Sequence, residues 1–264
     1  QGTSGQFGAS SINVKNKDND LLIDLHDVTV KKLLVDEASG NVDAEGIRWI
    51  KADVKINSLV GKKGKPRSSI KLNDVQGSNT SISGLFGGKA VSTILSNVYF
   101  TRLENKPGGT LQLDGLDITG KQLQVKGSTI DLTVDEYDIT DNNKSTFRRV
   151  AYKANNGNLD AGIFIPALTV TPHIQPLLNG DIALDAIQMT KPVINLSITE
   201  KNTVSEKKNG GLPKMDISEL HMVQPKINFT QVSNKGTLSL NWQGDKNTST
   251  NIPATWRSIS PPSL

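Results

Sequence analysis

The side chains that could carry out catalysis or bind a metal are few and scattered in this chain of 264 residues. Its three histidines are His26, His173 and His221, and none falls in a HExxH or HxH pattern. Each is therefore interpreted as a strand or turn residue. Cysteine is absent, which excludes disulfides, thiolate metal ligands and cysteine nucleophiles.

Acidic residues are dense in the middle of the chain, where a metal site would be sought first. A calcium loop needs oxygen ligands at fixed offsets around a glycine, and this spacing is missing, so weak Ca²⁺ binding at the surface is only an alternative. A carboxylate pair for glycoside hydrolysis would meet only in the fold, but the aromatic content of 5% argues against a sugar-stacking cleft. The acidic residues concerned are Asp114, Asp117, Asp131, Asp135, Glu136 and Asp138.

The glycine-rich segments do not match phosphate-binding motifs. Gly61-Lys62-Lys63-Gly64-Lys65 is not a Walker sequence, Gly84, Gly87 and Gly88 do not form GxGxxG, and no GxSxG is present. The lysine cluster is interpreted as a solvated loop, with contact to anionic lipid as the alternative. No aromatic residues interleave with it, so no nucleic-acid partner is predicted. We therefore predict that the chain is not an enzyme and binds no cofactor and no metal.

Composition favours a thin, extended architecture. Hydrophobic residues make up 35% of the chain, the mean hydropathy is −0.34 and the net charge is +4. A repeat array tolerates so few apolar residues because each unit buries little. No apolar run approaches the roughly 18 residues that span a bilayer. The sequence starts at Gln1, so we expect a processed form or an excised piece with any anchor outside it.

Period-2 alternation of apolar and polar residues predicts β-strands along most of the chain. It is clear in 21–26, 111–113, 130–135, 194–199 and 238–242. One segment, 84–99, has apolar spacing that also fits a short helix. The sequence therefore predicts an all-β fold: an elongated, curved, mostly antiparallel sheet, a gutter-like repeat array with at most one short helix.

Turn residues and composition suggest four segments. Residues 1–11 are expected to be a flexible N-terminal segment, and 12–109 an N-terminal β region with the possible short helix near 84–99. Residues 110–250 are expected to form a repeat β array, and 251–264 a C-terminal tail. Expected loops are Val60–Ser69, Asn105–Gly109, Thr140–Thr146, Asn155–Asn158 and Thr199–Pro213.

The most informative feature is an internal repeat. Asp181–Leu196 (DIALDAIQMTKPVINL) aligns with Lys214–Phe229 (KMDISELHMVQPKINF) when Pro192 is placed on Pro225, an offset of 33 residues (225 − 192). Each unit is interpreted as two strands joined by a kink at the proline, where the missing N–H costs nothing. Stacking such units joins their apolar stripes into one surface. The alternative is a β-meander whose prolines only mark turns.

At these residues the chain resembles the AsmA-like group of bacterial envelope proteins, within the bridge-like lipid transfer proteins. The resemblance lies in Ile187–Leu196 (IQMTKPVINL) and Leu220–Phe229 (LHMVQPKINF), more loosely in Leu113–Gly127, and in the "Tyr-x-Ala" and "Leu-x-Val-x-Pro" pattern of Phe147–Pro172. It covers about 110–242. Members of the group usually carry an N-terminal anchor and are much longer, so the resemblance implies a fragment or short relative.

The resemblance implies a gutter with an apolar inner face that handles lipid on the periplasmic side of the bacterial envelope, in lipid transport and outer-membrane biogenesis. The implied partners are a phospholipid or another acyl-chain ligand, a membrane reached by proximity or through a missing anchor, and a protein strand at an open sheet edge. The predicted groove-lining residues are Leu113, Leu116, Ile118, Ile130, Leu132, Ile163, Ile165, Ile182, Leu184, Ile187, Ile194, Leu196, Ile217, Leu220, Ile227 and Phe229.

Two other functions fit the same strands. The first is a β-solenoid or adhesin-like structural surface protein, in which the apolar residues would face a closed core. The second is a carbohydrate-active enzyme on a β scaffold, which would need a carboxylate pair.

Overall fold

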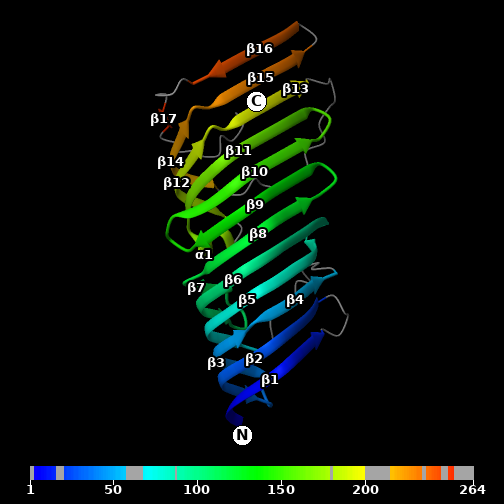
Figure 1. Cartoon of the computed structure of the whole chain (residues 1–264), viewed down its shortest axis with the longest axis vertical. Coiled ribbons are helices and arrows are strands. Elements are labelled where there is room, and N and C mark those ends of the chain that lie inside the picture. Colours follow the sequence, from blue (N-terminus) through cyan, green and yellow to red (C-terminus); the bar gives the residue numbers. More distant parts are fainter. Residues whose placement is uncertain are drawn as a thin grey trace. The chain divides into compact units, whose positions relative to one another are not determined.

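The computed structural model describes residues 3–15, 21–57, 68–86, 88–178, 181–199, 215–233, 236–244 and 249–252. These residues form strands almost throughout, with one short helix, α1 (Ile174–Leu178), and the strand pairing is mostly antiparallel (Figure 1). The all-β prediction is therefore confirmed. The chain divides into two compact units, 1–126 with 136–141, and 127–135 with 142–264.

The first unit is built from long strands paired mostly with their sequence neighbours. Pairing is antiparallel for β1–β2, β2–β3, β2–β4, β5–β6, β6–β7 and β6–β8, and parallel for β3–β5 and β4–β5. The strands are β1 (Thr3–Lys15), β2 (Leu21–Asp36), β3 (Asn41–Trp49), β4 (Lys51–Ile56), β5 (Ile70–Phe86), β6 (Lys89–Asn105), β7 (Gln112–Asp114) and β8 (Asp117–Lys126), with the end of β9 (Ile130–Thr140).

The second unit combines hairpins with parallel stacking. Pairing is antiparallel for β10–β11, β11–β12, β11–β13, β14–β17 and β15–β16, and parallel for β12–β14 and β13–β15. The strands are the start of β9, β10 (Ser145–Asn155), β11 (Leu159–Pro172), β12 (Ile182–Thr190), β13 (Val193–Thr199), β14 (Met215–Val223), β15 (Lys226–Ser233), β16 (Gly236–Gln243) and β17 (Ser249–Ile252).

Left-handed backbone residues punctuate the long strands. Asp74 and Asn79 in β5 have φ of 50° and 46°, and Arg149 in β10 has φ of 49°. In β5, the buried residues Val75 and Thr80 lie one position after such a residue. A strand normally returns to one face every two residues, and an extra residue shifts that count, as in a β-bulge. The apolar face therefore continues through each bend with a local spacing of three.

Close contacts across the first unit fix its packing. A Cβ on Gly77 would lie 1.8 Å from the ring of Trp49, so only glycine fits beneath that ring. The indole N–H of Trp49 donates a hydrogen bond to the Thr80 hydroxyl at 2.9 Å. Arg48 donates to both carboxylate oxygens of Asp74 at 2.7 and 2.8 Å. Both bonds come from one guanidinium nitrogen, and the other terminal nitrogen donates to the Asp74 backbone carbonyl at 2.5 Å, so charge-assisted hydrogen bonds tie β3 to β5.

Tyr137 forms a second buried contact in this unit. Its ring lies over Gly120, where a Cβ would be 2.4 Å from ring atoms. Its hydroxyl shares a hydrogen bond of 2.5 Å with the Thr93 hydroxyl. Burial raises the pKa of Tyr137 above its ordinary value of 10.0, and the hydrogen bond with Thr93 partly opposes this shift.

Several expectations about the chain's organisation differ from the structure. Residues 84–86 and 89–99 belong to the strands β5 and β6 instead of a helix, and the helix that the described residues form is α1. Residues 3–11 are paired in β1 instead of forming a flexible segment. The division between units falls near residue 126, not at 109.

The expected loops are confirmed where the structure describes them. Turns follow Asn105, Thr140 and Asn155. Most of the Val60–Ser69 loop, including the lysine cluster, lies outside the described residues, as do 200–213 of the Thr199–Pro213 loop. Of the expected tail, 251–252 belong to β17 and 253–264 lie outside the described residues.

Candidate functional site

The sequence repeat is a spatial repeat. β12 pairs with β14 and β13 with β15, in parallel, and the Cα partners include Leu184↔Ile217, Met189↔Met222 and Ile194↔Ile227. Each pair joins residues that the 33-residue alignment had placed together. Because these parallel strands are in register, equivalent side chains of the two repeats lie side by side. Each repeat therefore forms one layer of the sheet.

The two prolines occupy the kinks between these layered strands. Pro192 lies between β12 and β13, Pro225 lies between β14 and β15, and both are fully buried. Lys191 and Gln224, the residues before them, both have φ of 51°. The N–H of Lys226 donates to the carbonyl of Pro192 at 2.8 Å, so backbone pairing between the layers continues across the kink. The predicted position of the prolines is confirmed.

On the side of the proline kinks where β13 and β15 lie, five neighbouring strands align their apolar residues in two rows. Consecutive members of each row are Cα partners across β10, β11, β13, β15 and β16 (Figure 1). Partners in a sheet project from the same face, and at about 4.8 Å per strand the rows extend over roughly 19 Å. We call these residues the apolar ladder: Tyr152, Ile163, Ile194, Ile227 and Trp242 in one row, and Ala154, Ala161, Leu196, Phe229 and Leu240 in the other.

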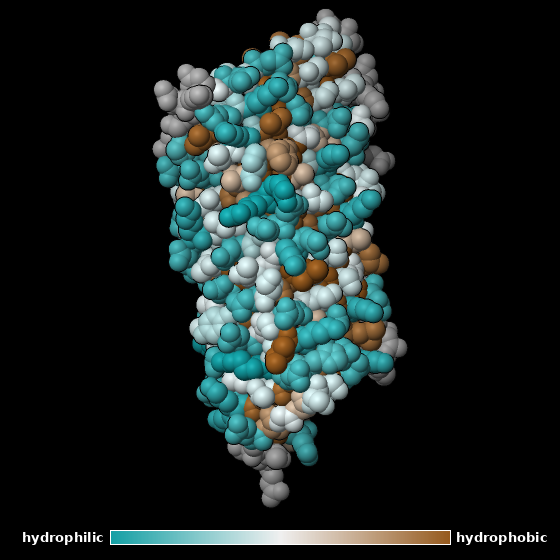
Figure 2. Space-filling view, viewed as in Figure 1, coloured by the Kyte–Doolittle hydropathy of each residue, from teal (hydrophilic) through white to brown (hydrophobic). Residues whose placement is uncertain are grey.

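The opposite face of the same strands is mainly polar, with the partners Phe164 and Val193 as an apolar pair at one end. Asn195, Asn228 and Asn241 are successive Cα partners, and the amide of Asn228 donates to that of Asn195 at 2.6 Å. Ser197, Thr230 and Ser239 form the next row. The strands of this region therefore have one apolar face and one mainly polar face, as their alternation predicted. Figure 2 shows one face of the protein, on which hydrophilic residues predominate and hydrophobic ones form small groups.

The structure divides the predicted groove-lining residues between the two units. Leu113, Leu116 and Ile118 lie in the first unit and the other thirteen in the second. Of the whole set, Ile165 and Ile217 are buried and the rest are half-buried. The residues brought together as direct partners are Ile163, Ile194 and Ile227, then Leu196 and Phe229, Leu184 and Ile217, and Ile187 and Leu220. Ile130 and Leu132 lie on β9 and Ile182 pairs with Met215.

Sequence reasoning missed part of the ladder. Leu240 and Trp242 had been recognised as an alternating strand, yet they were not assigned to the lining although β16 places them beside Phe229 and Ile227. Tyr152 and Ala154 enter through the Tyr-x-Ala strand. The alternation of these residues was the available signal, but it could not show which neighbouring strand they would join.

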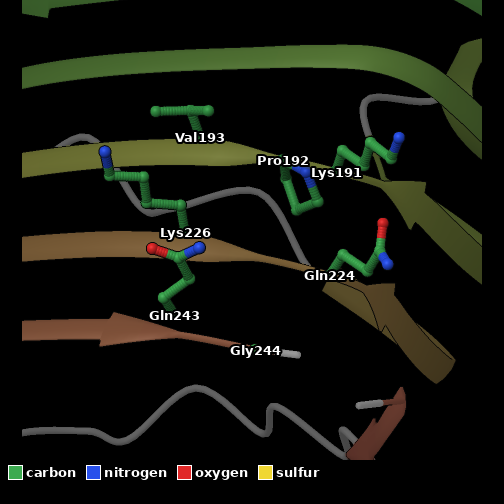
Figure 3. Close-up of a pocket in the computed structure, with 7 residues that line it drawn as sticks. All are labelled: Lys191, Pro192, Val193, Gln224, Lys226, Gln243 and Gly244. Carbon is green, nitrogen blue, oxygen red and sulfur yellow. The ribbon is translucent and has the colours of Figure 1, made fainter. Parts of the chain in front are cut away.

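A separate pocket of about 440 Å³ lies at the proline kinks (Figure 3). The residues that line it are Lys191, Pro192, Val193, Gln224, Lys226, Gln243 and Gly244. No carboxylate, imidazole or hydroxyl side chain is among the residues that line it.

His173 and Asp135, two of the residues considered for catalysis or metal binding, make contacts within the second unit. Nδ1 of His173 lies 2.7 Å from the side-chain oxygen of Asn142, and Nε2 lies 2.7 Å from a carboxylate oxygen of Asp185. With both ring nitrogens engaged, this imidazole could accept a substrate proton only by breaking a contact. Asp135 pairs with Arg149 at 2.5 Å. Within the described ranges, no group of His, Asp or Glu is arranged to hold a metal ion.

Comparison with protein-family models, curated proteins and solved structures finds no match for the chain. Among the described residues, none forms a helix with the length and apolar character needed to cross a bilayer.

Proposed function

We propose that the apolar ladder holds the acyl chain of a phospholipid or a similar lipid, without a chemical step. In this proposal the protein handles or transports lipid between membranes, on the periplasmic side of a bacterial envelope. One observation carries it: two rows of apolar side chains stay in register across five strands, while the opposite face of those strands is mainly polar apart from Phe164 and Val193.

The exposure of the ladder supports an open face. Ile163, Ile194 and Ile227 are half-buried although they lie in the interior of the sheet, and Leu240 is 57% exposed. Side chains in the first unit's core behave differently, since Val28 and Val75 are 2% and 3% exposed. An apolar face that keeps this much contact with water would gain free energy when an acyl chain covers it.

The energetics need no specific polar ligand. Burying an acyl chain yields about 0.8 kcal/mol per CH₂, so a chain that lies along several ladder residues would be held by area alone. A polar head group would remain in water. This accounts for a binding face without a cluster of polar side chains.

The alternatives predict other features. In a β-solenoid, successive coils are parallel throughout, whereas here antiparallel hairpins flank the parallel layers. A carbohydrate-active enzyme would lose turnover when one essential Asp or Glu is replaced, and lipid would be irrelevant to it.

The test is extraction of the chain, purified from a bacterial host, with organic solvent, followed by mass spectrometry. The wild type should release phospholipid. Ile227→Glu should release less, while Thr230→Glu, on the polar face of the same strand, serves as the matched control and should release as much as the wild type. Circular dichroism checks that both variants keep their strands.

Two results would contradict the proposal. One is a wild-type extract that contains no lipid. The other is equal lipid loss in both variants. Unfolding of Ile227→Glu alone would favour a sealed core, and Ile194→Glu then provides the second position for the same comparison.

A further inference from the structure

The last strand of the ladder, β16, has an edge whose residues favour pairing with another strand. Of the residues that the structure describes, only those of β15 pair with it. Edge strands in proteins usually carry charged residues or proline that discourage pairing. β16 (GTLSLNWQ) contains neither, although charged residues make up 21% of the chain. Its apolar residues are open, with Leu238 61% and Leu240 57% exposed.

The backbone shows which groups face the open edge. The N–H of Lys226 points to β13, where it bonds to Pro192. Because successive residues of a strand direct their N–H and C=O to opposite sides, Ile227 and Phe229 bond toward β16. Their partners Trp242 and Leu240 therefore bond back to β15. The N–H and C=O groups of the intervening residues, among them Ser239 and Asn241, point to the open edge.

From this pattern we propose that β16 pairs with β16 of a second copy, antiparallel, with Leu240 on the twofold axis. Ser239 then exchanges both backbone hydrogen bonds with Asn241 of the second copy, as the edge geometry requires. Leu238 lies beside Trp242 of the second copy, and Leu240 beside its own equivalent. The axis is perpendicular to the sheet, so both apolar ladders lie on the same side.

Two features favour a second copy over another partner. The pattern of apolar and polar residues in β16 is symmetric about Leu240, with apolar residues at Leu238 and Trp242 and polar residues at Ser239 and Asn241. A twofold contact needs such self-complementarity. Among the described strands, β1 also pairs on one side only, but it fits less well, because its register shifts between Gly5 and Phe7 and so breaks the alternation.

The proposal is tested first by sedimentation over a range of concentrations. Two short strands bury little surface, so the wild type should show a reversible monomer–dimer equilibrium. Ser239→Pro should be monomeric, because it removes an N–H that faces the open edge and leaves the bonds to β15 in place. Ser239→Ala is the control and should associate like the wild type. A wild type that stays monomeric, or a Ser239→Pro variant that still dimerises, overturns the proposal.

Cysteine crosslinking tests the register independently of proline. Residues at a non-hydrogen-bonded position lie about 4.5 Å apart between Cα atoms, within the range that a disulfide spans. Leu240→Cys should therefore form a disulfide-linked dimer on mild oxidation, and the wild type has no cysteine to interfere. Leu238→Cys faces Trp242 of the second copy and should crosslink far more slowly. Equal rates for the two variants contradict the proposed register.

Discussion

The side-chain nitrogen of Asn228 lies 2.6 Å from the side-chain oxygen of Asn195, and the two residues are Cα partners in the parallel strands β15 and β13. They are also equivalent positions of the sequence repeat, 33 residues apart. Because equivalent residues are neighbours in space, every position of the unit is placed beside its copy. The same register that pairs amides on the polar face pairs Ile194 with Ile227 on the apolar face.

The amide pair should contribute modestly to stability. Replacing Asn228 by alanine removes its hydrogen bond to Asn195 and is expected to lower the free energy of unfolding by about 0.5–1.5 kcal/mol. Urea denaturation measures the change. Asn241→Ala is the control, since it alters the same row of the sheet at the exposed strand β16, and it should cost less. Equal costs would show that the Asn195–Asn228 contact is not stabilising.

The close packing of Trp49 on Gly77 predicts a larger effect. In Gly77→Ala, the new methyl group would overlap the indole ring, which must move and give up its hydrogen bond to Thr80. We expect a loss of about 1–3 kcal/mol, typical of overpacking. Gly162→Ala is the matched control, because a Cβ at that strand glycine meets nothing within 4 Å. A neutral Gly77→Ala variant in denaturant titration would contradict this packing.

Tyr137 predicts a loss of stability in alkali. Its folded-state pKa lies above its ordinary value of 10.0 because the hydroxyl is desolvated. Above about pH 10 the unfolded chain releases this proton while the folded chain keeps it, so the free energy of unfolding falls as the pH rises. Below pH 10 both states hold the proton and this contribution is constant.

The measurement is urea denaturation between pH 8 and pH 11, values that bracket the ordinary tyrosine pKa of about 10. Tyr137→Phe should be less stable than the wild type near pH 8, since the Thr93 hydroxyl loses its contact with Tyr137 and keeps its bond to the Lys121 carbonyl, and the difference should shrink in alkali. A constant difference for Tyr137→Phe across this range would refute the assignment.

Much of the architecture follows from sequence pattern alone. The alternation of Ile194, Leu196 and Ile198 predicts a strand with one apolar face, and the alignment of Pro192 with Pro225 predicts which residues become partners. These predictions succeed because identical or similar residues recur at fixed positions of the repeat.

The parallel stacking in the first unit was not predicted. There β3 and β4 lie beside β5 with an offset of 28 residues (70 − 42), but the partners are not identical residues: some are similar, as in Val54↔Ile82, and others differ, as in Ala52↔Thr80. Without identical residues or a marker such as the prolines, the sequence alignment is not evident. In this unit the side chains of neighbouring strands are matched in size and burial, and this match can be recognised only in the folded structure.

The mistaken helix in β6 has a physical cause as well. Val91, Leu95 and Val98 are spaced as on one face of a helix. In the structure they belong to a strand whose register with β8 shifts between Leu95 and Asn97. Such an irregularity lengthens one interval between apolar residues from two to three, here from Leu95 to Val98. Together with the preceding interval of four, from Val91 to Leu95, it imitates the helical period.

Quenching of Trp242 by a lipid whose acyl chain carries bromine tests the central claim most directly. Trp242 ends one row of the apolar ladder and is 36% exposed, so an acyl chain on the ladder would bring bromine against its ring. We predict that the brominated phospholipid quenches the tryptophan fluorescence more than its unbrominated equivalent does, and that Trp242→Phe abolishes most of this difference. Equal fluorescence with the two lipids, or a difference that survives in Trp242→Phe, would contradict lipid binding at this face.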